Sequence, residues 1–185
     1  MSYTVKYRVQ NACAFRAVVE PVVDVVMNVG QENDGPAILW IVIGTIAVHF
    51  IEEYALNFPG WTLQRFSVPL SFEDFHLVNA CVSLYAIACA VVGWRLPSFS
   101  LSIAALVGLN GLFHAGGALL SGGYAPGAVT GAVLFVPVAV ASYRHAHRAS
   151  VLSTRALVVS LSLGVLWHVF LGATFYLKYF GAVAP

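Results

Sequence analysis

The sequence comprises 185 residues, of which 59% are hydrophobic and only 9% are charged. Soluble domains contain roughly 25% charged residues, so this composition excludes an ordinary water-soluble fold and predicts a membrane protein. The net charge of +1 argues against nucleic acid as a partner, because proteins that bind it neutralise phosphates with many basic side chains.

The N-terminal segment, residues 1–33, is predicted to lie on the membrane surface. Residues 11–30 are apolar but place Arg16, Glu20 and Asp24 at intervals of four, which forms one charged stripe on a helix. The start of the chain lacks an apolar core followed by a small-residue cleavage site. We therefore expect the first span, rather than a signal peptide, to anchor the chain.

Five later segments are apolar and long enough to cross a bilayer, which takes about 20 residues. They run over residues 36–58, 72–94, 98–120, 126–143 and 155–179. The sequence therefore predicts an all-α protein: residues 1–185 form a single transmembrane domain, with a polytopic helix bundle over residues 36–180 after the interfacial helix.

The basic residues predict how the bundle is oriented. If the N-terminus is cytoplasmic, only Arg65 and Lys178 lie outside. The other basic residues then lie inside: Lys6, Arg8, Arg16, Arg95, Arg144, Arg148 and Arg155. This asymmetry follows the positive-inside rule. It predicts an integral membrane protein with a cytoplasmic N-terminus and an external C-terminus.

An ionisable cluster lies in the second half of the first span. The stretch HFIEEY places His49, Glu52 and Glu53 within five residues, although one isolated charge near the bilayer centre costs on the order of 3 kcal/mol. At about 100° per residue, the three side chains are expected to share one helix face. Glu52 and Glu53 are also the only carboxylates in the interior of the predicted spans. Intramembrane acid–base chemistry would therefore use them.

Polar side chains on three other spans are expected at a similar depth. Asn110 and His114 are four residues apart on the third span and share a face. His76 and Asn79 lie early in the second span, and His168 lies just past the middle of the fifth. This convergence predicts a site in the outer half of the bilayer.

The motifs resemble those of a known family. HFIEE at 49–53 matches the motif that names the HXXEE-domain family of small membrane proteins, and NGLFH at 110–114 resembles that family's NXXXH motif. The segment GGYAPGAVTGAVLFVP is similar to the family's YxPGxxT stretch. The resemblance covers about residues 36–140. It implies an integral membrane enzyme with the functional set His49, Glu52, Glu53, Asn110 and His114, and with Arg65 or Arg95 as the family's characteristic arginine.

Three functions fit this cluster. The preferred one is acid–base proton transfer of the isomerase or cyclase type, because two adjacent carboxylates cannot both ionise cheaply in a low dielectric; it requires no cofactor. The second is a metal-dependent hydrolase or oxidase in which His49, His114 and Glu52 or Glu53 hold zinc or iron. The third is a non-enzymatic proton-coupled carrier or lipid-binding module.

The expected substrate is a hydrophobic lipid or isoprenoid-like molecule that the bilayer supplies. Aromatic side chains pack against such a molecule or stabilise a developing cation, and His and Asn side chains can hydrogen-bond its polar group. The candidate substrate contacts are His76, Asn79, Tyr124, Trp167 and His168.

Overall fold

A computed structural model describes residues 36–181, so the predicted interfacial segment, residues 1–33, lies outside the described residues. Helices account for most of the described chain, and the predicted all-α fold is confirmed. In order they are α2 (Ala37–Ala55), α3 (Phe58–Phe66), α4 (Phe72–Val92), the 3₁₀ turn η1 (Gly93–Arg95), α5 (Pro97–Ser121), α6 (Ala128–Thr130), the π-helical turn η2 (Gly131–Phe135), α7 (Val136–Arg148) and α8 (Thr154–Tyr179).

Within the described residues, five helical segments are long and apolar enough to cross a membrane. They are Ala37–Ala55, Phe72–Arg95, Pro97–Leu120, Ala128–Arg148 and Thr154–Tyr179. Each corresponds to one predicted span, which supports an integral membrane protein in a lipid bilayer. The fourth span differs most, since it continues past the predicted end at Tyr143 to Arg148. Basic side chains in its last turn favour this extension, because they interact well with the helix dipole.

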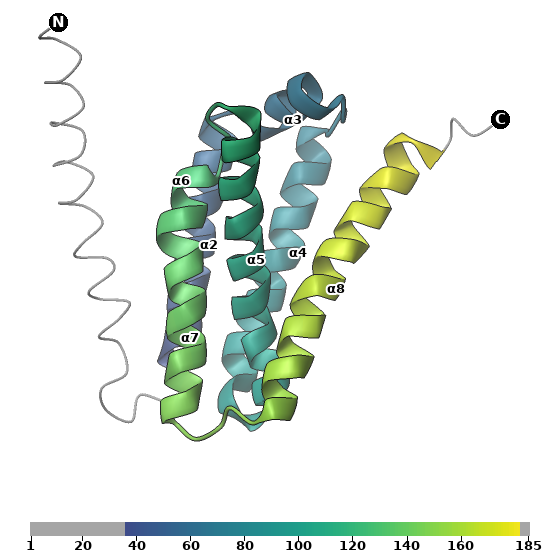
Figure 1. Ribbon diagram of the computed structural model, residues 1–185. Helices are drawn as coiled ribbons and strands as arrows, with labels where there is room; N and C mark the ends of the chain where they lie inside the picture. The colour runs from purple at the N-terminus through teal and green to yellow at the C-terminus, as the bar shows by residue number, and fades with distance from the viewer. Residues whose placement is uncertain (1–35, 182–185) are drawn as a thin grey trace, which may run out of the picture.

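The short helix α3 was not predicted. The chain leaves α2 at Asn57, which has a left-handed backbone with φ of 52°, a conformation that asparagine tolerates better than most residues. The Asn57 side chain then accepts a hydrogen bond from the Gly60 N–H at 3.2 Å and caps α3. As a result, α3 lies across one end of the bundle (Figure 1), and its first residue, Phe58, reaches the interior.

The buried face of α2 leads directly into the polar cluster. Ile38, Val42 and Ile46 are 0–1% exposed and lie four residues apart, which places them on one side of the helix facing α4, α5 and α7. His49 and Glu53 continue the same stripe and are 1% and 5% exposed. The packing of the apolar stripe therefore sets the rotation of α2 and points these two polar side chains inward.

Helix α8 packs on α5 through its first half and diverges from the bundle toward its C-terminal end (Figure 1). The close approach is at Gly164, where an added Cβ would lie 2.7 Å from the Cβ of Ala105. Near the other end, Lys178 Nζ donates to both carboxylate oxygens of Asp74 at 2.7 and 2.6 Å, and the Tyr179 hydroxyl donates to Asp74 as well. Between these contacts, α8 forms one wall of a cavity.

Candidate functional site

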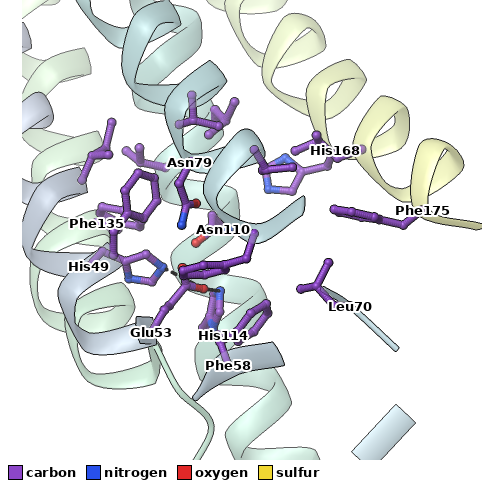
Figure 2. A pocket seen from close by; sticks show the side chains of 18 residues that line it. His49, Glu53, Phe58, Leu70, Asn79, Asn110, His114, Phe135, His168 and Phe175 are labelled. Atoms are coloured by element: carbon purple, nitrogen blue, oxygen red, sulfur yellow. Dashed lines mark ion pairs between the residues drawn. The ribbon is translucent and has the colours of Figure 1, made fainter. Parts of the chain in front are cut away.

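A cavity of about 180 Å³ lies between α2, α4, α5 and α8, with Phe58 of α3 among its lining residues (Figure 2). Most of its wall is apolar. Polar side chains reach it from four helices: His49 and Glu53 from α2, Asn79 from α4, Asn110 and His114 from α5, and His168 from α8. An apolar cavity with a few convergent polar groups is typical of a small-molecule site.

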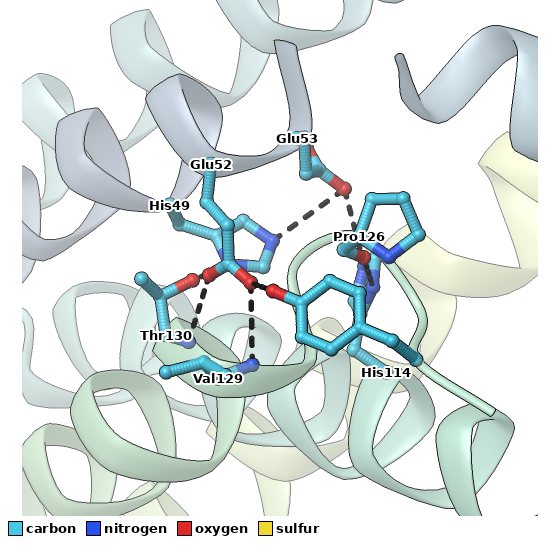
Figure 3. Close-up of polar contacts among 8 residues, drawn as sticks. His49, Glu52, Glu53, His114, Pro126, Val129 and Thr130 are labelled. Atoms are coloured by element: carbon cyan, nitrogen blue, oxygen red, sulfur yellow. Dashed lines mark hydrogen bonds and ion pairs between the residues drawn. The ribbon is translucent and has the colours of Figure 1, made fainter. Parts of the chain in front are cut away.

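His49, Glu53 and His114 form the most compact polar cluster in this cavity. Glu53 Oε1 lies 3.5 Å from His49 Nε2 and 3.2 Å from His114 Nε2 (Figure 3). The three side chains are 1%, 6% and 9% exposed, in that order along the chain. One ligand atom from each lies within 4.8 Å of the others. The structure thus brings together one glutamate and two histidines of the predicted set.

The second ring nitrogen of each histidine has its own partner. His114 Nδ1 lies 2.6 Å from the Pro126 carbonyl oxygen, and because a carbonyl only accepts, Nδ1 carries the hydrogen. His49 Nδ1 lies 2.7 Å from Thr130 Oγ1. The Thr130 hydroxyl also hydrogen-bonds the Glu52 carboxylate, to which it must donate, so it accepts from His49 Nδ1–H. When the rings are neutral, both therefore turn the lone pair of Nε2 toward Glu53.

With neutral rings, the Glu53 carboxylate and the two Nε2 atoms are all hydrogen-bond acceptors, with no donor between them. His49 Nε2 is buried and has no hydrogen-bond partner among the described residues, since 3.5 Å from Glu53 exceeds an ordinary hydrogen bond. A cation at the centre would satisfy all three atoms. Two ligands of a tetrahedral zinc ion, with bonds of about 2.0–2.1 Å, lie about 3.3 Å apart, close to the two distances from Glu53 Oε1 to the histidines. Metal-bound histidines also commonly donate their other N–H to a carbonyl, as His114 does.

Glu52 belongs to a different network. Its Oε1 accepts hydrogen bonds from the Tyr124 hydroxyl and, at 3.3 Å, from the Val129 N–H, while Oε2 accepts from the Thr130 N–H at 2.8 Å (Figure 3). Partial burial and the neighbouring Glu52 carboxylate raise the pKa of the Tyr124 phenol, which keeps it a donor. The two glutamates therefore do not share one face as expected: Glu53 faces the cavity, and Glu52 faces the loop before α6. The structure does not pair the two carboxylates.

Comparison with known proteins identifies the family. The sequence model of a family described as "protein of unknown function with HXXEE motif" matches residues 40–142, more than half of the chain. The chain belongs to the HXXEE family. No curated protein and no solved structure matches the chain. The resemblance predicted from the motifs is confirmed, and the matched region includes the His49, Glu53 and His114 cluster but ends before α8.

Sequence reasoning missed the contribution of the segment between α5 and α7 to the HXXEE cluster. Pro126 and Thr130 hold the two imidazoles, and Gly127, with φ of +84°, packs against both rings. The π-helical turn η2, a feature often found at functional sites, follows at once and places the Phe135 ring 4.2 Å from that of His49. The YxPGxxT stretch is the sequence signal for this segment, but the motif alone does not show which residues contact the histidines.

The other predicted residues of this HXXEE protein divide into two groups. Asn79, Asn110 and His168 line the cavity, and Asn110 Oδ1 is buried without a hydrogen-bond partner among the described residues. His168 Nδ1 lies 2.9 Å from the Gly164 carbonyl oxygen, to which it donates. The predictions of Asn79 and His168 as substrate contacts, and of Asn110 as a member of the functional set, are compatible with these positions.

The second group lies outside the cavity of the HXXEE protein. His76 is exposed and packs against Tyr54, and Trp167 packs against Tyr85. His76 and Trp167 miss the cavity because each is the direct sequence neighbour of a cavity-lining residue. One position along a helix turns the side chain by about 100°, which here points it away from the cavity. Tyr124 contacts Glu52 instead. Neither candidate arginine, Arg65 nor Arg95, lines the cavity.

Proposed function

We propose that this protein is an integral membrane enzyme that holds a zinc or iron ion between His49, Glu53 and His114 and acts on a hydrophobic molecule taken from the bilayer. One observation carries the proposal: three buried atoms that can ligate a metal ion lie within 4.8 Å of one another, and one of them, His49 Nε2, has no hydrogen-bond partner in the described part of the chain. Buried polar groups are normally satisfied, and a cation satisfies all three at once.

The ligand set indicates the type of chemistry. Two histidines and one carboxylate leave coordination positions for water or substrate, and such an ion activates water or polarises a carbonyl when it is zinc, or supports oxidation when it is iron. Asn110 and Asn79 line the same cavity. Their amides are suited to orient the polar group of a substrate next to the ion.

The cavity size limits what is bound. At about 180 Å³ it slightly exceeds an engineered cavity of about 150 Å³ that admits benzene. It therefore accommodates the reacting part of a lipid or isoprenoid-like molecule, while the remainder stays in the bilayer. Apolar side chains such as Phe58, Phe75 and Leu171 line the cavity and suit such a chain.

Acid–base proton transfer of the isomerase or cyclase type is the second candidate. It uses the same three side chains with a proton in place of the metal ion. Since Glu52 is engaged elsewhere, the shared proton would lie between Glu53 and an imidazole rather than between two glutamates. With a proton on His114 Nε2, the 3.2 Å approach to Glu53 Oε1 is an ion pair, and this distance favours the proton-transfer version.

Lipid turnover tests the proposal directly. Purified protein in lipid nanodiscs is incubated with a total membrane lipid extract, and the lipids are compared by mass spectrometry before and after. We expect one lipid class to be consumed by the wild type and spared by His114→Gln, with His76→Gln as a matched control outside the cavity. Two products whose masses add up to that of the lipid plus one water indicate hydrolysis, a product altered by oxygen or hydrogen indicates oxidation, and a product of unchanged mass indicates isomerisation. Turnover by His114→Gln at the wild-type rate would contradict the proposal.

We also propose that the end of the bundle at which α2 begins is cytoplasmic. The start of α2 and the end of α8 lie at opposite ends of the bundle (Figure 1). Near the first of these ends lie Arg95 in η1, Arg144 and Arg148 toward the end of α7, and Arg155 at the start of α8. The positive-inside rule then places that end in the cytoplasm. A C-terminal epitope tag should be labelled in intact cells and an N-terminal tag only after permeabilisation. The reverse pattern would refute the orientation.

A further inference from the structure

We infer that Glu52, the first glutamate of the HXXEE motif, is a positioning residue. It holds residues 124–130 against α2 by hydrogen bonds, a contact called the clamp below, so that this segment orients both histidines of the His49, Glu53 and His114 cluster, called the centre. The structure assigns the two adjacent glutamates different tasks: Glu53 faces the cavity and Glu52 holds the segment that supports the cluster (Figure 3). The metal readout of this inference rests on the proposed function, whereas the contacts that carry it do not.

The first step is the attachment of the 124–130 segment to α2. The Glu52 carboxylate accepts from the Tyr124 hydroxyl at the start of the segment and from the Val129 and Thr130 N–H groups at its end. These acceptor bonds are charge-assisted and therefore stronger than neutral ones. Because they come from both ends of the segment, one side chain fixes its position against the helix.

The second step leads from the segment to the histidines. The Thr130 hydroxyl, held by Glu52, accepts from His49 Nδ1 at 2.7 Å, and the Pro126 carbonyl accepts from His114 Nδ1 at 2.6 Å. Each contact fixes the rotation and tautomer of a ring, so that Nε2 faces Glu53. Partners of this kind typically change metal affinity by about 10–100-fold when removed.

The third step concerns the chemical identity of Glu52. Glutamine keeps the shape of the side chain but replaces one acceptor oxygen by an NH₂ group, which would face N–H and O–H donors. Aspartate keeps the charge but is one methylene shorter. Glu52 itself does not line the cavity, so it touches neither the cavity nor a molecule within it. Its effect on the centre must pass through Thr130 and Pro126.

The experiment combines two readouts on the full-length protein in nanodiscs. Hydrogen–deuterium exchange of residues 124–130 measures the clamp without any metal, and titration of the metal-free protein with Zn²⁺ measures the centre. The variants are Glu52→Gln, Thr130→Val and the double variant. Glu53→Gln serves as the ligand variant. Glu73→Gln, an exposed carboxylate at the start of α4, is the matched control.

We expect Glu52→Gln to speed exchange in residues 124–130 and to weaken Zn²⁺ binding about 10–100-fold with unchanged stoichiometry. Thr130→Val should weaken binding by a similar factor, and the double variant should lose little more, because both act along one path. Glu53→Gln should remove binding and leave exchange as in the wild type.

Three outcomes would overturn the inference. The first is exchange in Glu52→Gln that equals that of Glu73→Gln, since it would show that Glu52 does not hold the segment. The second is loss of Zn²⁺ binding with unchanged exchange, which would make Glu52 a ligand. The third is faster exchange with unchanged Zn²⁺ affinity, which would make the clamp irrelevant to the centre. If the wild type binds no Zn²⁺, the proposed metal function fails instead, and the exchange comparison alone still decides whether Glu52 holds the segment.

Discussion

Wild-type protein purified without chelators is expected to contain one zinc or iron ion per chain, and the Glu53→Gln variant is expected to contain none. Glutamine is nearly isosteric with glutamate, but its neutral amide leaves two uncharged imidazoles to hold a dication in a buried site. Loss of a direct ligand should weaken binding by more than the roughly 10–100-fold typical of an outer-shell change. Elemental analysis of the purified protein gives the stoichiometry.

Matched control variants distinguish loss of a metal ligand from general effects of substitution on the protein. Glu73→Gln removes an exposed carboxylate from the start of α4 and should keep the full metal content. His114→Gln should lose the metal, whereas His76→Gln should keep it, because His76 is exposed and lies outside the cavity. Chelation should lower the thermal stability of the wild type and leave that of Glu53→Gln unchanged, since only bound metal stabilises the fold. Metal-free wild-type protein that remains active would refute the metal centre and favour proton transfer.

The fold was largely predictable from sequence because the bilayer imposes a simple rule. Each span needs about 20 apolar residues, and the ends predicted for the five spans lie close to those of the five helical segments in the described residues. The short helix α3 escaped prediction because it depends on one left-handed residue, Asn57, and on a local side-chain cap. Hydropathy cannot detect such a backbone reversal, since it averages over many residues.

The candidate site was predictable where the relevant contacts are local. His49 and Glu53 are four residues apart on α2, as are Asn110 and His114 on α5, and helix geometry alone places each pair on one face. The division between Glu52 and Glu53 was not predictable. A helix places adjacent side chains about 100° apart, but only the tertiary arrangement shows that one direction meets the cavity and the other meets Tyr124 and Thr130. Those partners are more than 70 residues away in sequence.

Substitution of Gly127 by alanine is expected to damage the centre although Gly127 is not a ligand. Its φ of +84° is a conformation that alanine adopts at a cost of about 1–2 kcal/mol. In addition, an alanine Cβ would lie 2.7 Å from His49 Cε1 and 2.8 Å from His114 Nδ1. Both rings are tied through Nδ1 to Pro126 and Thr130, on either side of Gly127 in the same segment, so making room for the Cβ shifts the rings relative to Glu53. We expect Zn²⁺ affinity to fall at least about tenfold, comparable to loss of an outer-shell partner.

Gly122 provides the matched control because it shares the backbone conformation but not the contact. Its φ is +64°, and nothing lies within 4 Å of an added Cβ. Gly122→Ala should therefore cost about the same 1–2 kcal/mol of conformational strain while leaving Zn²⁺ affinity as in the wild type. Thermal unfolding in detergent measures the shared cost, and Zn²⁺ titration measures the difference. Equal affinities of the two variants would mean that the histidines do not depend on close packing by Gly127. A selective loss in Gly127→Ala would show that the two imidazoles are held by the 124–130 segment as well as by their own helices.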